Sequence, residues 1–196
     1  MLLSRPSIEL YFGRGGTGKT CLALSRIGPA RSILFDINEQ EILARHAVVC
    51  TTARELVLAL QGNARRICWR GFGTLGPAAF EFGNKAAWAA GDLVVYWDEV
   101  DFMMEPSHCP PWAYRLINAG RHHGVTIKAT ARRPASVSRH LTAGATAVYS
   151  YAVTGSRDVV YLADFFGRDA AAALPNLGRG QALIWTEHGT TQKKIY

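Results

Sequence analysis

Short apolar runs alternate with segments of helical character along most of this chain. Runs typical of buried strands lie at residues 8–12, 32–37, 47–50, 66–69, 92–97, 125–130 and 147–153. Segments with helical spacing or helix-boundary residues lie between them, at 21–27, 53–61, 77–90, 112–121 and 137–143. Because strands that alternate with helices build β-α-β units, we expect an α/β fold with a mostly parallel central sheet flanked by helices.

Local signals refine this picture. Thr52 and Glu55 have the spacing of a capping box at the start of a helix, and Pro111 suits the first position of another. The glycine-rich residues 70–76 predict a mobile loop that carries one cation, Arg70, and one aromatic side chain, Phe72.

The last part of the chain is less regular. Residues 158–166 fit either a helix or a strand, and the helix-end pattern at 164–167 favours a helix. Residues 181–186 and 192–195 predict a closing C-terminal β-hairpin. The sequence contains no linker-like or repeated segment, so we expect a single domain over residues 1–196.

The composition indicates a folded, basic protein. Its 196 residues are 48% hydrophobic, and its formal net charge is +7. This charge suits a polyanionic partner such as nucleic acid, although a merely soluble basic surface has the same signature. No apolar run is long enough for a signal-peptide core or a membrane span, so we expect no transmembrane segment. Four cysteines without C-x-x-C spacing predict reduced, buried thiols: Cys21, Cys50, Cys68 and Cys109.

Residues 13–20 carry the strongest chemical signal. They fit the phosphate-binding pattern G-x-x-x-x-G-K-[ST] at every fixed position, between a predicted strand and a predicted helix. Glycines let backbone N–H groups cradle phosphate oxygens, Lys19 adds a charge to the β- and γ-phosphates, and the Thr20 hydroxyl can bind Mg²⁺. We expect the nucleotide to be bound by Gly13, Arg14, Gly15, Gly16, Thr17, Gly18, Lys19, Thr20 and Cys21.

A second motif follows the most strand-like stretch of the chain. Residues 92–97 end in Asp98 and Glu99, the pattern of a Walker B strand, although acidic pairs also occur on ordinary strand ends. Asp98 is expected to hold Mg²⁺, and Glu99 to orient the attacking water or take its proton. The chain has no guanine-reading Asn-Lys-x-Asp after this strand, and a kinase needs no water-activating Glu. Hydrolysis is therefore favoured over phosphate transfer or switching.

Arg121 is a further catalytic candidate, at the basic end of a predicted helix. It is interpreted either as a cap on the helix dipole or as an arginine finger that reaches the γ-phosphate of a neighbouring subunit.

Residues 121–143 resemble the FtsK/HerA superfamily of DNA-pumping ATPases. That family shows a helix ending in Arg-His-x-Gly, a strand ending in a Gln-Arg-Pro-like turn and a Val-Ser-x-x-Leu helix. Here the corresponding segments are 121–124, 132–134 and 137–141. The compact size is most similar to that of the genome-packaging ATPases of tailless, membrane-containing icosahedral viruses. The resemblance runs from the phosphate loop to about Val153, with a weaker match at 177–183.

The resemblance implies a RecA-like core that assembles into a ring, as a hexamer, around double-stranded DNA, with ATP and Mg²⁺ between subunits. It implies that Glu99, Lys19 and Arg121 are catalytic and that Thr20 and Asp98 bind the metal. A viral capsid vertex or membrane protein would recruit the ring, in the host cytoplasm or the virion. The chain departs from the family where Ala131 and Arg132 replace the expected strand-end Gln. Thr130 or Arg132 is the candidate substitute, unless Arg132 and Arg133 act across the interface.

Several alternatives stay open at this stage. The chain could be another FtsK/HerA-like DNA or protein-export pump of phage or cell, a non-catalytic nucleotide-gated assembly factor, or a small-molecule kinase. Arg70 and Phe72 could track a DNA backbone or belong to a plain solvated loop. The basic cluster formed by Arg132, Arg133 and Arg139 could line a pore or simply cover the end of the sheet.

Overall fold

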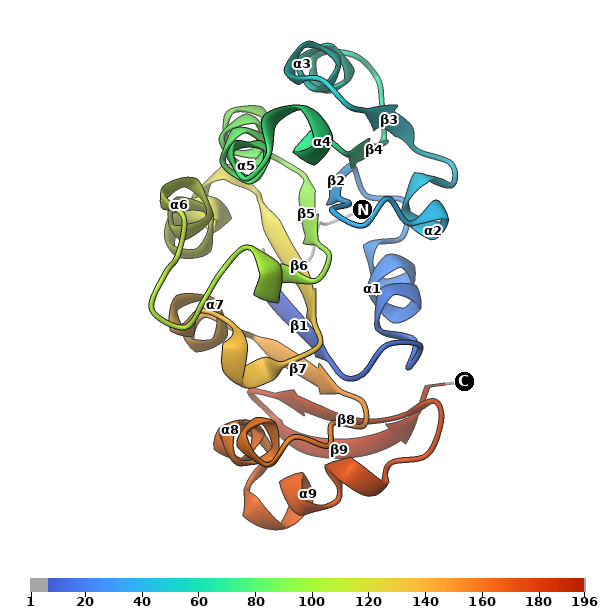
Figure 1. The fold of residues 1–196 in the computed structure, drawn as a ribbon, viewed down its shortest axis with the longest axis vertical. Coiled ribbons are helices and arrows are strands. Elements are labelled where there is room, and N and C mark those ends of the chain that lie inside the picture. Colours follow the sequence, from blue (N-terminus) through green and yellow to red (C-terminus); the bar gives the residue numbers. More distant parts are fainter. Residues whose placement is uncertain (1–6, 196) are drawn as a thin grey trace.

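The computed structural model describes residues 7–195, which form a sheet of nine strands in the order β3-β4-β2-β5-β6-β1-β7-β8-β9 (Figure 1). The strands are β1 (Ile8–Phe12), β2 (Ser32–Phe35), β3 (Val48–Cys50), β4 (Arg66–Trp69), β5 (Val94–Trp97), β6 (Thr126–Ala131), β7 (Ala147–Ser150), β8 (Gln181–Thr186) and β9 (Gly189–Lys194). Neighbouring strands from β3 to β7 pair in parallel, and β8 and β9 are antiparallel.

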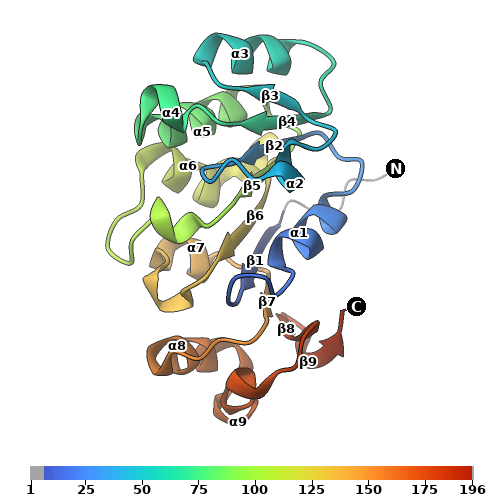
Figure 2. The same ribbon diagram turned by 45° about the vertical axis from the view of Figure 1, so that its right-hand side comes forward.

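Helices cover both faces of this sheet. One face carries α1 (Lys19–Ile27) and α2 (Glu41–Ala44). The other carries α5 (Ala78–Ala90), α6 (Pro111–Ala119), α7 (Arg139–Ala143) and α8 (Ser156–Phe166), as Figures 1 and 2 show. The remaining helices are α3 (Ala53–Gln61) beside β3, the short α4 (Phe72–Leu75), and α9 (Arg168–Ala172) next to α8.

Each layer of helices closes its own apolar core. Ala23 and Ile27 of α1 and Leu43 of α2 pack with Tyr11 and Leu34 on one face of the sheet. The larger core on the other face is built from strand residues such as Ile33 and Trp97 together with residues of α5, α6, α7 and α8. Burial on both faces explains why the central strands read as continuous apolar runs rather than as alternating patterns. The predicted α/β fold with a mostly parallel sheet and a C-terminal β-hairpin is therefore confirmed.

Local predictions are confirmed at two places where the physical signal is strong. Thr52 caps α3 as a capping box, because its hydroxyl accepts a hydrogen bond from the Glu55 N–H while the Glu55 carboxylate accepts one from the Thr52 N–H. The ambiguous segment at 158–166 is the helix α8, whose Asp158, Tyr161 and Leu162 are buried.

Two sequence-based expectations are wrong. The segment 70–76 contains the helix α4 rather than a mobile loop, and Arg70 forms an ion pair with Asp36 (Nε–Oδ2, 2.9 Å) instead of facing solvent. The pair ties Arg70 to the end of β2, so this arginine is not free to follow a DNA backbone. Cys21 is exposed on α1, whereas Cys50 and Cys68 are buried as expected.

Among residues 7–195, no helix combines the length and the apolar character that crossing a membrane requires.

Candidate nucleotide-binding site

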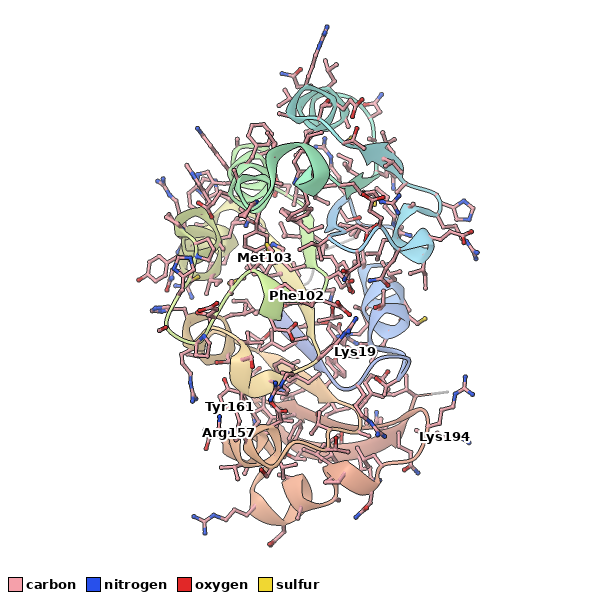
Figure 3. All side chains as sticks on the ribbon, viewed as in Figure 1. Lys19, Phe102, Met103, Arg157, Tyr161 and Lys194 are labelled. Carbon is pink, nitrogen blue, oxygen red and sulfur yellow. The ribbon has the colours of Figure 1, made fainter. Side chains whose placement is uncertain are left out.

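The phosphate loop connects β1 to α1, at the edge of the sheet where the parallel strands end. Lys19 and Thr20 form the first turn of α1, and Gly18 precedes them with φ 98°, a left-handed conformation that glycine adopts without strain. Among the described residues no side chain caps α1, so its first N–H groups face the loop and are suited to an anion. Figure 3 shows Lys19 at this edge. The nine predicted nucleotide-binding residues, 13–21, thus form the loop after β1 and the first turn of α1.

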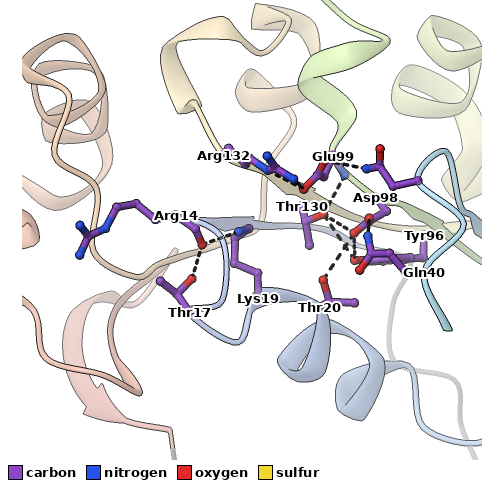
Figure 4. A network of polar contacts seen from close by, with 11 residues as sticks. Arg14, Thr17, Lys19, Thr20, Gln40, Tyr96, Asp98, Glu99, Thr130 and Arg132 are labelled. Carbon is purple, nitrogen blue, oxygen red and sulfur yellow. Dashed lines mark hydrogen bonds and ion pairs between the residues drawn. The ribbon is translucent and has the colours of Figure 1, made fainter. Parts of the chain in front are cut away.

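Lys19 is folded back onto its own loop. Its ammonium group donates to the Arg14 carbonyl oxygen at 2.9 Å, and the Thr17 hydroxyl donates to the same oxygen at 2.8 Å (Figure 4). Burial lowers the pKa of Lys19, while the charges of Glu99 and Asp98 oppose this effect. A phosphate group would give the lysine a partner of opposite charge in place of a neutral carbonyl.

Gly13 is the glycine on which the path of the loop depends most. Its φ is +144°, and a Cβ added there would lie 2.8 Å from the Cβ of Tyr151. Next to it, the Arg14 N–H donates to the Ala152 carbonyl oxygen at 3.2 Å, which ties the loop to the segment after β7. The close approach to Tyr151 leaves no room for a side chain.

Gly13→Ala is therefore expected to lower the free energy of unfolding by about 2 kcal/mol. An alanine backbone is strained at this φ, and the added Cβ would collide with Tyr151. Urea denaturation followed by circular dichroism measures this loss. Gly15→Ala is the matched control, since a Cβ there meets nothing within 4 Å, and its expected change is within about 0.5 kcal/mol. Equal losses in the two variants would contradict the steric argument.

Asp98 and Glu99 follow β5 directly. In the sheet, β6 lies between β1 and β5, so the carboxyl ends of all three strands meet beside the phosphate loop. Asp98 is 4% exposed. Its Oδ1 accepts hydrogen bonds from the Tyr96 hydroxyl (2.6 Å) and the Thr130 hydroxyl (2.9 Å), and its Oδ2 accepts one from Gln40. Burial raises the pKa of Asp98, and the hydrogen bonds from Tyr96 and Thr130 act against that rise.

Thr20 and Asp98 form a set of oxygen donors that fits Mg²⁺. The Thr20 hydroxyl oxygen and Asp98 Oδ1 are 3.5 Å apart, close to the roughly 3 Å between neighbouring ligands of an octahedral Mg²⁺ site. Because both Asp98 oxygens already accept hydrogen bonds from protein groups, contact through a water molecule also fits. The structure thus brings together the two residues predicted to bind the metal.

Glu99 has an unusual backbone and a fully engaged side chain. Its φ of 47° is left-handed, and its N–H donates to the Thr130 hydroxyl oxygen at 2.9 Å. The carboxylate forms an ion pair with Arg132 through Oε1 and accepts a hydrogen bond from Asn38 through Oε2. Thr130 thus contacts both Asp98 and Glu99, and Arg132, the other candidate for a polar sensor, contacts Glu99 directly (Figure 4).

Arg121 lies elsewhere. It belongs to the 3₁₀ turn η2 (Gly120–His123), which precedes the amino end of β6, and its side chain is exposed. The carboxyl end of β6 lies at the phosphate loop, so Arg121 is at the opposite edge of the sheet from Lys19 and Glu99. The structure does not bring Arg121 to the site of its own chain.

Sequence reasoning missed the residues that follow β2. Asn38 and Gln40 donate to Glu99 and Asp98 respectively, and Asp36 and Arg70 hold this segment in place: Asp36 accepts from the Gln40 N–H, and Arg70 donates to the Gln40 carbonyl oxygen. The sequence offered only a partial signal, polar residues directly after a buried strand, because strand-end polar residues gather at one edge of a parallel sheet. That β2 neighbours β5 is shown by the structure alone.

A small cavity adjoins the phosphate loop on the side away from Glu99. It has a volume of about 160 Å³ and lies between the loop and the segment that leads into β8; its lining includes Arg14, Gly16, Thr17, Tyr151 and Arg179. Arg179 was not among the predicted site residues. The cavity is suited to the part of a nucleotide that extends from the phosphates.

Solved structures match this chain in fold, whereas the comparisons of sequence find no match. No protein-family model and no curated protein matches the sequence. The genome packaging NTPase B204 from Sulfolobus turreted icosahedral virus 2, in complex with ATP-gammaS, matches with a TM-score of 0.78 at 14% identity over 99% of this chain and 100% of that chain. B204, the DNA-packaging ATPase from Sulfolobus turreted icosahedral virus, matches with a TM-score of 0.75 at 15% identity, over 98% of this chain and 100% of that chain.

VirB4 of Thermoanaerobacter pseudethanolicus matches with a TM-score of 0.64 at 10% identity, over 96% of this chain and 89% of that chain. At sequence identities of 10–15%, the structural similarity establishes a shared fold. The structural neighbours are those expected from the resemblance in sequence: this chain has the P-loop ATPase fold shared by the viral genome-packaging B204 proteins and by FtsK/HerA-like ATPases.

Proposed function

We propose that this chain is a Mg²⁺-dependent ATPase that translocates double-stranded DNA and packages a viral genome into a preformed capsid. The observation that carries the proposal is the placement of Glu99 beside Asp98, whose Oδ1 lies 3.5 Å from the Thr20 hydroxyl at the start of α1. The B204 proteins, described as genome-packaging and DNA-packaging enzymes, match over almost their full length and support the biological role.

In this proposal each residue has a defined task in hydrolysis. The loop N–H groups and Lys19 bind the β- and γ-phosphates, and Thr20 and Asp98 hold Mg²⁺, which would neutralise phosphate charge. Glu99 orients a water molecule whose oxygen bonds to the γ-phosphorus while the bond to the bridging oxygen of ADP breaks. Glu99 takes a proton from that water, and the products are ADP and inorganic phosphate.

The proposal includes assembly into a hexameric ring around DNA. Arg121 is exposed and lies across the sheet from the site of its own chain, so its proposed role as an arginine finger requires a neighbouring subunit. The net charge of +7 suits a polyanion such as DNA. The ring would work in the host cytoplasm or at the packaging vertex, recruited there by a capsid or membrane protein.

Purified protein is expected to release phosphate from ATP, and long double-stranded DNA at low salt is expected to increase the rate several-fold, because a motor couples hydrolysis to its track. A phosphate-release assay measures both rates, with Lys19→Ala as the blank. Release that ignores DNA would contradict translocation, and an ATP-binding protein without release would favour the non-catalytic assembly factor.

A further inference from the structure

Strand β9 forms one outer edge of the sheet. It pairs with β8 in antiparallel order, and within residues 7–195 no strand pairs with its other side (Figure 1). All six of its residues, Gly189–Lys194, are exposed. An edge strand presents a row of N–H and C=O groups without strand partners, which is a template for another extended segment.

The register of the hairpin shows which backbone groups of β9 face outward. The N–H of Ile195, directly after β9, donates to the Gly180 carbonyl oxygen at 2.7 Å. Because backbone groups alternate between the two sides of an antiparallel strand, every second residue counted back from Ile195 bonds to β8. The N–H and C=O groups that point away from β8 are therefore those of Thr190, Gln192 and Lys194. The free edge thus offers donors and acceptors along the length of the strand.

The side chains of β9 give this edge a positive charge. Lys193 and Lys194 are successive residues, so their side chains lie on opposite faces of the strand. Among the described residues neither lysine has an ion-pair partner, and β9 itself contains no carboxylate. Figure 3 shows Lys194 at this outer edge. A segment with acidic side chains on both of its faces would therefore neutralise both lysines.

The same features argue against a second copy of this chain and against nucleic acid as the occupant of the edge. The two edge strands that a second copy could offer, β3 and β9, contain no carboxylate, and β9 would add two more lysines. Lysines on an edge strand disfavour such self-pairing. Phosphate oxygens of nucleic acid accept hydrogen bonds but have no N–H to donate to the outward carbonyl groups, whereas each residue of a peptide backbone supplies a donor and an acceptor.

We propose that β9 is a docking edge for an extended acidic segment of another protein, which adds to the nine-stranded sheet as a further strand. The backbone of the segment pairs with the outward groups of Thr190, Gln192 and Lys194. Two successive carboxylates of the segment face Lys193 and Lys194, one on each face of the sheet. Main-chain hydrogen bonds supply affinity, and the carboxylates select this segment over neutral or basic ones. The docking needs no nucleotide and goes beyond the proposed function.

A synthetic peptide tests the docking edge. The peptide Thr-Val-Thr-Glu-Glu-Thr-Val-Thr places two successive carboxylates between residues that favour strands. Wild-type protein is expected to bind it in fluorescence anisotropy at low salt, and to bind the same peptide with lysine in place of both glutamates about tenfold more weakly. In hydrogen-exchange NMR, the Gln192 N–H is expected to exchange fast in the free protein and slowly with the peptide. The Thr191 N–H, which bonds to β8, is expected to be protected in both states.

Two variants change the edge in different ways. Gln192→Pro removes an outward N–H and keeps the ladder to β8, because an edge strand tolerates proline where the N–H faces solvent. It is expected to bind the peptide about tenfold more weakly at an unchanged thermal midpoint. Lys193→Glu combined with Lys194→Glu, which keeps every backbone group, is expected to weaken binding at least as much. Arg54→Glu combined with Lys85→Glu reverses as many charges at exposed positions of α3 and α5 and is expected to bind as the wild type does.

The outcomes separate the possible occupants. Wild-type protein that does not bind the peptide, or binds it without protection of the Gln192 N–H, would overturn strand addition. Protection of that N–H in the protein alone, increasing with protein concentration, would make a second copy the occupant. Loss of duplex DNA binding in Lys193→Glu with Lys194→Glu, while peptide binding stays unchanged, would assign the two lysines to nucleic acid instead.

Discussion

Glu99→Gln is expected to bind ATP at least as tightly as the wild-type protein and to release phosphate about 10²–10⁴-fold more slowly. Glutamine has nearly the same volume, and its side-chain oxygen can still accept the hydrogen bond from Asn38. The backbone bond from residue 99 to Thr130 does not involve the side chain. The substitution therefore removes the group proposed to take the proton, together with the ion pair to Arg132, and keeps the contacts to Asn38 and Thr130. Single-turnover phosphate release, with ATP binding measured in parallel, checks both expectations.

The matched control is Glu187→Gln, which removes an equal charge from an exposed side chain in the turn between β8 and β9. It is expected to hydrolyse ATP at the wild-type rate. Normal turnover in Glu99→Gln would refute the assignment of the base. Loss of ATP binding in Glu99→Gln would show instead that the carboxylate has a role in holding the nucleotide.

Lys128→Met is expected to lower the free energy of unfolding by about 3–5 kcal/mol at pH 7, because it leaves a buried charge with too few partners. Lys128 of β6 is 4% exposed, and its ammonium group pairs with Glu9 of β1 at 2.5 Å. Glu9 also pairs with Arg26 of α1 (2.8 Å) and accepts a hydrogen bond from Tyr11. Methionine keeps the apolar stem of the lysine, but within residues 7–195 it leaves the carboxylate with the partly exposed Arg26 as its only cationic partner. Equilibrium urea denaturation measures the difference.

The loss of stability in Lys128→Met is expected to depend on pH. Burial by itself would raise the pKa of Glu9, but the hydrogen bonds and charges of Arg26 and Lys128 outweigh it and lower the pKa from 4.5 to about 2. A carboxyl whose pKa is lower in the folded state stabilises the fold above the unfolded pKa, and this contribution disappears as the pH falls to the folded pKa. Between pH 4.5 and 2 the wild-type protein should therefore lose stability more steeply than Lys128→Met.

Lys193→Met on the exposed strand β9 is the control for the chemical change. Glu9→Leu combined with Lys128→Met is expected to recover part of the loss, since the buried carboxylate beside residue 128 is then removed as well. A single Lys128→Met variant as stable as Lys193→Met would contradict the importance of the buried charges.

The secondary structure was predictable where local signals and burial agree. The apolar runs that became β1, β4 and β5 are buried on both faces, so their hydrophobicity follows directly from their position in a covered sheet. The capping box of α3 is a local motif and needs no tertiary contact. The segment 70–76 was misjudged because its order depends on a distant partner, the ion pair between Arg70 and Asp36.

Within the candidate site, the sequence predicted the residues that form contiguous motifs and missed those that strand order brings in. The phosphate loop and Asp98-Glu99 are contiguous motifs whose residue types are dictated by phosphate and metal chemistry. Asn38, Gln40 and Thr130 carry no motif, and only the order of strands brings them to Asp98 and Glu99. The segment 36–40 after β2 and the end of β6 became part of the site because β2 and β6 flank β5 in the sheet.

The sequence by itself thus determined the α/β class, the phosphate-binding loop and the acidic strand end, because each is encoded in a run of neighbouring residues. Only the tertiary structure decided which strands are adjacent, and with them the partners of the two carboxylates. It also decided that Arg132 rests on Glu99 and that Arg121 lies at the far edge of the sheet. The reason is physical: strand order and side-chain pairing are set by long-range packing free energy, which no short stretch of residues contains.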